Sequence, residues 1–255
     1  PDVTDVQEII SILEEKEMGS NLLLHHIHKQ VLRVLHQAEY LAPRYHVVIA
    51  NPPYMGGKGM NAALKTFAER YYPETKSDLF AMFMERNLEL AISKGSISMI
   101  TMQSWMFLSS YENMRERLLN ENTILSMAHL GARAFDTIGG EVVSTTAFVI
   151  NKNNIVNYRG VYLRLVKPNS EVNKDYELKR NKTNPYIAEA TDFKKIPGNR
   201  IAYWISKKEL ELYTHNELLN EVCQPRKGLD TGENGLFLRF WFEVSINKCS
   251  FINIS

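Results

Sequence analysis

Val47-Val48-Ile49-Ala50-Asn51-Pro52-Pro53-Tyr54 is the stretch that decides the fold. Its four apolar residues predict a short buried strand, and the prolines end that strand because neither has an N–H to donate. Pro53 also disfavours the helical conformation at Pro52, so the turn is stiff and extended. We therefore expect the Asn51 side chain, the Pro52 carbonyl and the Tyr54 ring just past the carboxyl end of a strand. Open α/β sheets bind ligands at that edge.

The groups in this turn suit chemistry on an aromatic amine. The exocyclic amine of a nucleobase is a poor nucleophile because its lone pair is delocalised into the ring. Asn51 Oδ1 and the Pro52 carbonyl could each accept one of its N–H bonds and draw the nitrogen toward tetrahedral geometry. The Asn51 amide has essentially no basicity, so it would position the amine and not deprotonate it. Tyr54 offers a flat face for a base swung out of a duplex. The alternative is a diproline loop that only ends a strand.

An Asn-Pro-Pro-Tyr motif after an apolar strand resembles the catalytic motif of S-adenosylmethionine-dependent amino methyltransferases, above all the adenine-N6 DNA enzymes. Further segments resemble the adenine methyltransferase of bacteriophage exclusion (BREX) systems, which is similar to the modification part of fused restriction–modification enzymes. Those segments are residues 51–58, 76–87, 99–106 and 129–135.

This resemblance implies a Rossmann-like α/β sheet with flanking helices, followed by the start of a target-recognition region. It implies methyl transfer from S-adenosylmethionine to a flipped-out adenine of double-stranded DNA, with other phage-defence proteins as further partners. It assigns catalysis to Asn51, Pro52, Pro53 and Tyr54, and places Asn51 beside the cofactor.

Composition limits how the chain could contact DNA. Its 30 basic and 29 acidic side chains give a net charge of +1, which argues against coating nucleic acid through bulk charge. DNA contacts would come from single cations, for which the candidates are Lys58, Arg133, Arg226 and Lys227. The slightly negative mean hydropathy and the lack of a bilayer-spanning apolar run indicate a soluble cytoplasmic protein.

No metal site is expected. Cys223 and Cys249 lack metal-ligand spacing and suggest no disulfide framework. Four histidines lie between residues 25 and 36, where a metal site is conceivable. No Cys, Asp or Glu stands at helical ligand spacing among them, so a solvated helix face is the preferred interpretation.

Periodicity and capping residues predict alternating helices and strands. The order favours βαβ units and a parallel sheet. Helices are expected at 4–17, 22–39, 62–71, 77–93, 110–119 and 207–216, and strands at 45–50, 96–101, 124–130, 142–150 and 161–166.

Three segments are expected near the Asn51 turn. Trp105 follows the strand at 96–101 on the same rim and could wall the site, but a buried structural tryptophan explains it equally. The resemblance makes Phe135 a second stacking candidate, which could also pack inward. The glycine-rich run Met55–Met60 could cradle a DNA phosphate through Lys58 and backbone N–H groups, or could simply be a flexible connection.

A change of composition past Asn151 predicts a boundary near 151–160. We expect a helical lead-in at 1–44, the catalytic half of a methyltransferase domain at 45–155, and its end with the start of target recognition at 156–255. The basic run at 174–182 is either a solvated surface or a DNA contact.

The glycine-rich turn and the acidic residue that would hold S-adenosylmethionine do not precede residue 51. In the family that turn lies upstream, so the sheet is expected to be truncated at its cofactor half. The lack of an initial methionine likewise suggests a fragment. Two alternatives to an adenine-N6 enzyme stay open: a non-catalytic remnant or subunit that binds DNA or a partner, and an enzyme acting on RNA or on a protein glutamine.

Overall fold

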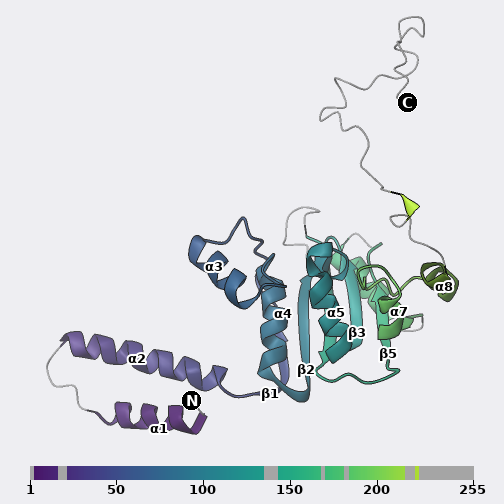
Figure 1. The fold of residues 1–255 in the computed structure, drawn as a ribbon. Coiled ribbons are helices and arrows are strands. Elements are labelled where there is room, and N and C mark those ends of the chain that lie inside the picture. The colour runs from purple at the N-terminus through teal and green to yellow at the C-terminus, as the bar shows by residue number, and fades with distance from the viewer. Residues whose placement is uncertain are drawn as a thin grey trace, which may run out of the picture. The chain divides into compact units, whose positions relative to one another are not determined.

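A mixed sheet of six strands organises the computed structural model, in the order β1-β2-β4-β3-β5-β6 (Figure 1). Parallel pairing joins β1 to β2 and β3 to β5, while β4 and β6 run antiparallel to their neighbours. The strands are β1 (Tyr45–Ala50), β2 (Ala91–Met102), β3 (Thr123–Gly131), β4 (Thr145–Asn151), β5 (Arg159–Arg164) and β6 (Tyr186–Glu189).

The structure describes residues 3–16, 22–134, 143–167, 170–180, 184–215 and 222–223. Contacts divide the chain into two units, residues 1–214 and 215–255. The sheet and the helices around it belong to the first unit.

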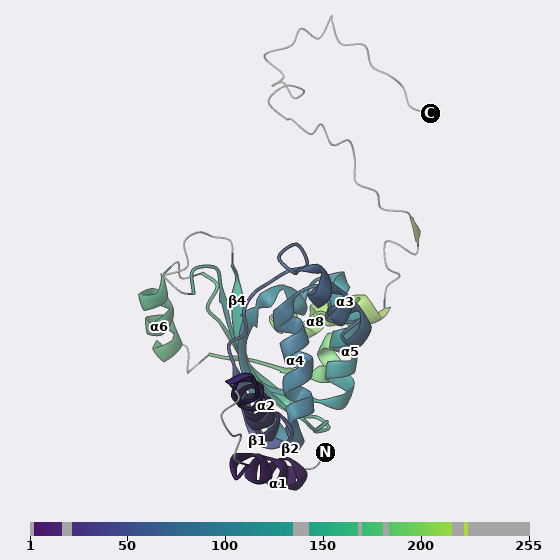
Figure 2. The same cartoon turned by 90° about the vertical axis from the view of Figure 1, so that its left-hand side faces the viewer.

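Helices lie on both sides of the sheet. Figure 2 shows α4 and α5 on one side and α6 on the other. The helices are α1 (Val3–Glu14), α2 (Leu22–Leu41), α3 (Ala62–Tyr71), α4 (Leu79–Leu90), α5 (Glu112–Glu121), α6 (Glu171–Arg180), α7 (Ala190–Lys194) and α8 (Lys207–His215), with 3₁₀ turns η1 (Gln103–Met106) and η2 (Ser109–Tyr111).

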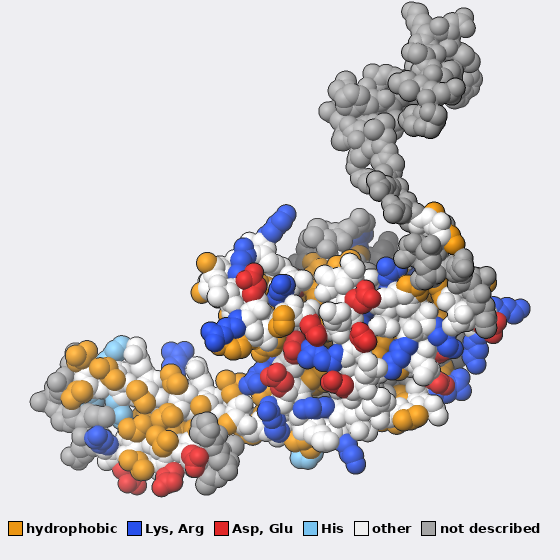
Figure 3. Space-filling view, in the orientation of Figure 1, with side chains coloured by type: hydrophobic (Ala, Val, Ile, Leu, Met, Phe, Trp, Pro, Cys, Tyr) orange, Lys and Arg blue, Asp and Glu red, His pale blue; other side chains and the backbone are white. Residues whose placement is uncertain are grey.

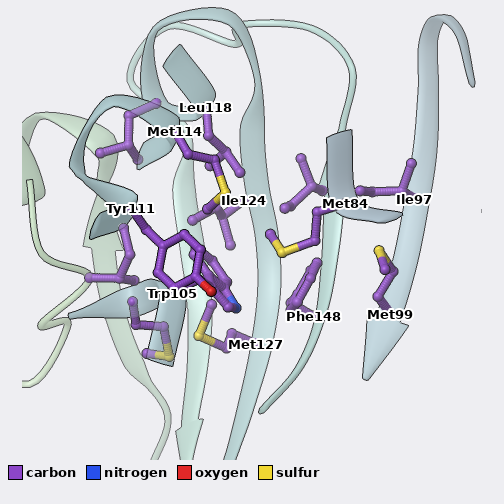
Figure 4. Close-up of a cluster of buried hydrophobic side chains, with 14 of the residues drawn as sticks. Met84, Ile97, Met99, Trp105, Tyr111, Met114, Leu118, Ile124, Met127 and Phe148 are labelled. Atoms are coloured by element: carbon purple, nitrogen blue, oxygen red, sulfur yellow. The ribbon is translucent and has the colours of Figure 1, made fainter. Parts of the chain in front are cut away.

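The main core lies between the sheet and the α4–α5 layer (Figure 4). Alternate residues of β2 and β4 face it, because side chains alternate between the faces of a strand. The side chains labelled in the close-up are Met84, Ile97, Met99, Trp105, Tyr111, Met114, Leu118, Ile124, Met127 and Phe148. Burying a side chain of this size stabilises the fold by about 1.5–3 kcal/mol relative to leaving it exposed.

The opposite face of the sheet is apolar at β1 but remains open. Val47 and Ile49 are 58% and 77% exposed, and they pair with Ser96 and Ser98 of β2 on that same face. Parallel strands are usually buried on both faces. β1 is also an outer strand of the sheet that the described residues form. The described residues thus leave both one edge and one apolar face of this strand uncovered.

The helices α1 and α2 pack against each other, and two histidines take part in that contact. His28 Nε2 lies 2.7 Å from the Leu13 carbonyl oxygen, and His36 lies 3.6 Å from both Glu14 and Glu39. No group of three metal-ligating side chains occurs among the described residues. In that same part of the chain, no helix has the length and hydropathy to cross a membrane.

The main departures from the predicted elements concern the direction of one strand, the bounds of α4, and three elements after β5. The sheet is mixed and not parallel, because β4 inserts between β2 and β3 and pairs antiparallel with both. The helix expected at 77–93 begins only at Leu79, with Asp78 as its N-cap, and it ends at Leu90, directly before β2. The residues of α6 were interpreted as a charged run that forms no helix. Neither β6 nor α7 was predicted.

Candidate active site

The carboxyl ends of three strands form one rim of the sheet. Strands β1, β2 and β3 run in the same direction, because β4 is antiparallel to both β2 and β3. Asn51 follows β1, Gln103 follows β2, and His129 lies near the end of β3. The sequence placed Asn51 and the segment that follows the strand at 96–101 on this rim, and the parallel pairing of β1 and β2 confirms that placement.

The Asn51 turn combines exposed and buried groups. Asn51 and Pro53 are exposed, Pro52 is buried, and Tyr54 is half-buried. The Tyr54 ring meets the Phe80 ring edge-on, with centroids 6.3 Å apart and planes at 86°. Its hydroxyl is buried without a hydrogen-bond partner, and this burial raises the pKa of Tyr54. The ring therefore belongs partly to the core, which fixes its position beside Asn51.

Tyr54→Phe is expected to leave stability unchanged or raise it by up to about 1 kcal/mol. A buried hydroxyl without a partner has lost its water and gained no bond in return, so its removal relieves a desolvation cost. Tyr54→Ala should instead destabilise the fold by about 3 kcal/mol through lost ring packing. Urea unfolding of the three proteins checks this order. A Phe variant as unstable as the Ala variant would show that the hydroxyl has a partner.

The glycine-rich run after Tyr54 is tied to the start of α4. Met55 N–H donates to Asp78 Oδ1 at 3.0 Å, and the Met55 carbonyl accepts from Leu79 N–H at 3.0 Å. Gly57 N–H donates to the Ser77 carbonyl at 3.2 Å. These two N–H groups are used inside the protein, so they cannot cradle a phosphate. Lys58 is exposed at the tip of this run.

The Trp105 side chain does not line the site at the rim. It is 0% exposed, its Nε1–H donates to Thr101 Oγ1 at 3.2 Å, and its ring meets Phe148 at 5.3 Å. The 3₁₀ turn η1 directs this indole into the core beneath the rim. The prediction that Trp105 contacts the target base is therefore wrong. The alternative, a buried tryptophan that packs in the core, is what the structure shows.

His129 is the centre of a network that the sequence did not reveal. The side chain is 4% exposed, with Nε2 2.5 Å from Gln103 Oε1 and Nδ1 3.1 Å from the Tyr203 hydroxyl. The imidazole stacks on Trp204 at 6.1 Å, and Arg164 lies 4.6 Å above that indole. Burial, with smaller effects from Arg164 and Lys174, lowers the pKa of His129 to about 4. The imidazole is thus neutral at neutral pH.

This buried neutral histidine predicts a loss of stability in acid. A histidine titrates near pH 6.5 in the unfolded chain, so between pH 6.5 and 4 the unfolded state binds a proton that the folded state does not. The neutral His129 therefore makes its full contribution to the free energy of unfolding above pH 6.5. That contribution falls as the pH is lowered, by about 2 kcal/mol between pH 7.5 and 5. Urea unfolding at both pH values, for the wild type and His129→Gln, measures it. An equal pH dependence in both proteins would contradict it.

The candidate DNA-contacting cations lie in different parts of the chain. Lys58 and Arg133 are exposed, whereas Arg226, Lys227 and the stacking candidate Phe135 lie outside the described residues. Figure 3 shows basic and acidic side chains interspersed over one face of the molecule. Within the basic run at 174–182, Lys174 is buried and donates to the carbonyls of β3 residue Leu130 at 2.7 Å and of Leu165 at 2.9 Å. Lys174 thus anchors α6 to strand ends, and its buried ammonium is used by these two carbonyls.

Comparison with curated proteins identifies two close relatives. The chain is 42% identical to the adenine-specific methyltransferase PglX of Lacticaseibacillus casei (strain Zhang), over 97% of the chain and 21% of the relative. It is 49% identical to the adenine-specific methyltransferase BrxX of Escherichia coli O9:H4 (strain HS), over 86% of the chain and 18% of the relative. The chain thus spans about a fifth of the length of each.

Among solved structures, one similar chain is a nuclease-deletion mutant of the Type ISP restriction-modification enzyme LlaGI, in complex with a DNA substrate mimic. The TM-score is 0.49 at 15% identity, over 71% of this chain and 20% of that one.

A family model covers about half of the chain, from residue 5 to residue 135, and includes the Asn51 turn and the ends of β2 and β3. It agrees with the two curated relatives and confirms the resemblance inferred from the motif segments. The chain belongs to the Eco57I restriction-modification methylase family.

Proposed function

We propose that this chain supplies the target-base side of an adenine-N6 DNA methyltransferase. The observation that carries the proposal is the Asn51 turn, which follows the outer parallel strand on the carboxyl-end rim. Ligands of open α/β sheets bind at this edge. Both curated relatives are named as adenine-specific methyltransferases, which supports adenine as the base.

The residues of the turn would bind and orient the amine. Asn51 is exposed, so its Oδ1 can accept one N–H bond of the adenine amine, and the Pro52 carbonyl would accept the other. Two fixed acceptors hold the nitrogen lone pair in one direction, which is the orientation effect that group transfer needs. The half-buried Tyr54 ring is held against Phe80 and would stack on the base. Lys58 and Arg133 would contact the DNA backbone, as would Arg226 and Lys227.

S-adenosylmethionine would supply the methyl group, but the described residues do not by themselves form its site. Beyond β1 the described sheet has no further strand, and so no strand-end turn there that could approach the cofactor. Asn51 would be the residue that faces it. The open apolar face at Val47 and Ile49 supports the same proposal, because it would be covered by the rest of a larger domain.

The proposal is tested by a chimera. Residues of this chain replace the corresponding segment of the E. coli relative, and methyl transfer from tritiated S-adenosylmethionine to mixed-sequence duplex DNA is measured. An active chimera supports catalysis by these residues. A folded chimera that binds the cofactor and DNA without turnover would instead support the non-catalytic alternative. Label in RNA or in protein glutamine, and not in DNA adenine, would support the third hypothesis.

A further inference from the structure

The hairpin of α1 and α2 buries one side of each helix and exposes a second apolar side. Val6 and Ile10 of α1 are buried, and Leu32 and Leu35 of α2 are partly buried. Figure 3 shows further apolar side chains gathered over these two helices. Seven of them are 41–62% exposed: Ile9, Ile12, Leu24, Ile27, Val31, Val34 and Leu41.

These seven side chains share one face of the hairpin. A polar contact marks the other face, where Gln7 Nε2–H donates to Glu39 Oε1 at 3.0 Å. At about 100° per residue, Ile9 and Ile12 lie about 140–160° around α1 from Gln7, and the exposed residues of α2 centre about 110° from Glu39. We call this apolar side the hairpin face.

The spacing on α2 is that of a helix-packing seam. Residues 24, 27, 31, 34, 38 and 41 are apolar and alternate steps of three and four, which is the a/d repeat of a coiled coil. A stripe this narrow packs against another helix, and an exposed contiguous apolar patch marks an interaction site. The seam is flanked by Gln30 and Gln37, which are uncharged, so a like helix would meet no like charge there.

The stripe on α1 is complementary to itself. Asp5, Ile9, Ile12 and Lys16 follow one another at steps of four, three and four. The turn continues to Lys16, because its N–H donates to the Leu13 carbonyl at 3.3 Å. In an antiparallel pair of such helices, Ile9 lies opposite Ile12 of the second copy, and Asp5 lies opposite Lys16 of the second copy. A parallel pair would instead oppose like charges.

One two-fold axis can relate both helices to those of a second copy. His28 Nε2 lies 2.7 Å from the Leu13 carbonyl oxygen, and Gln7 bonds Glu39. These two contacts place the middle of residues 9–12 level with the middle of residues 31–34. The axis that brings Ile9 to Ile12 of the second copy therefore also brings Val31 to Val34 of the second copy. An interface built from the same patch on both subunits has this symmetry.

We propose that the hairpin face is a dimerisation surface, on which a second copy of this chain packs with antiparallel helices to form a four-helix bundle. The apolar seam supplies the buried area, and the Asp5–Lys16 pairs at the two ends of α1 fix the antiparallel direction. The proposal does not depend on methyl transfer or on the chemistry of the rim.

The test measures the mass of the 255-residue chain by analytical ultracentrifugation over a concentration series. The wild type should reach twice the 29.4 kDa of one chain. Val34→Glu should raise the dimer dissociation constant by at least about a hundredfold, because it buries an unpaired carboxylate on each side of the seam. Circular dichroism checks that the helices persist.

Tyr40→Glu is the matched control on the same helix. Tyr40 is 70% exposed, more than Val34 at 62%, but it lies on the far side of α2 from the seam. Loss of this larger apolar side chain should leave the dissociation constant unchanged within about twofold, since residues outside the interface contribute little to binding. Equal weakening by both variants would overturn the proposal.

A charge exchange tests the antiparallel direction. Asp5→Lys opposes like charges at both ends of α1 and should weaken the dimer about tenfold. Asp5→Lys with Lys16→Asp restores opposite charges and should recover most of the affinity. A double variant as weak as the single variant would overturn the arrangement.

Two further outcomes would show that a second copy does not occupy this face. A wild type that stays at the mass of one chain overturns the proposal. So does a dimer that Ile49→Lys dissociates and Val34→Glu does not, because association would then use the open face of β1. The methyl-transfer activity of the chimera reports on the proposed function in either case.

Discussion

Asn51→Ala in the chimera is expected to lower methyl transfer by about a hundred- to a thousandfold and to leave the fold intact. The residue is exposed on the rim, so its loss removes no core packing. Loss of a single preorganised polar contact to the reacting group typically costs this much in rate. Single-turnover transfer of tritiated methyl to duplex DNA measures the chemical step directly, and circular dichroism reports the fold.

Asn61→Ala provides the matched control. Asn61 is also exposed, and its Oδ1 caps α3 by accepting from Leu64 N–H at 2.8 Å. Its removal should cost about 1 kcal/mol of stability and little activity. If Asn51→Ala transfers methyl groups at nearly the wild-type rate, Asn51 does not hold the target amine, and the proposed role of this turn is wrong.

Local chemistry explains which parts of the fold could be predicted from sequence. The strand at 45–50 and the helix at 62–71 have the predicted bounds, because prolines and an asparagine cap mark their ends within a few residues. The reversed direction of β4 depends on pairing with β2, about fifty residues away, and no local pattern encodes it. Helix α6 has little apolar periodicity, and Lys174 anchors it to backbone carbonyls of distant residues.

The same contrast between local sequence signals and contacts of distant residues applies to the candidate site. The position of Asn51 and Tyr54 just after β1 was predicted, because strand and turn are contiguous in sequence. The His129 network was not, because Tyr203 lies 74 residues further along the chain. An early sign was available, since His129 begins one of the segments that carry the family resemblance. The inward direction of Trp105 depends on the turn η1, whose formation the sequence alone did not indicate.

Arg115→Met is expected to destabilise the chain by about 3–5 kcal/mol, a large part of the stability of a typical domain. Arg115 is 0% exposed and lies on α5 beneath the rim. Its Nη1 donates to the carbonyls of Trp105 at 2.8 Å and Leu108 at 2.7 Å, and its Nη2 to the Gly198 carbonyl at 2.6 Å. Burial lowers its pKa to about 10, so it stays charged at neutral pH.

The cost arises from the carbonyls that the substitution leaves behind. A methionine fills similar volume but donates nothing, and each buried carbonyl left unpaired costs about 1–3 kcal/mol. Arg115→Lys should recover only part of the loss, because an ammonium lacks the planar fork that reaches three separated oxygens.

Arg117, two residues further on the same helix, is the matched control for this prediction. It is partly exposed and pairs with Glu74 and Glu85 at 3.0 Å each. Because the Arg117 side chain is 39% exposed and water screens part of its interaction with the two carboxylates, Arg117→Met should cost less than Arg115→Met. Urea unfolding followed by tryptophan fluorescence compares the variants. Equal midpoints for Arg115→Met and Arg117→Met would contradict the role of Arg115 as the clamp that joins η1, η2 and the Gly198 turn beneath the rim.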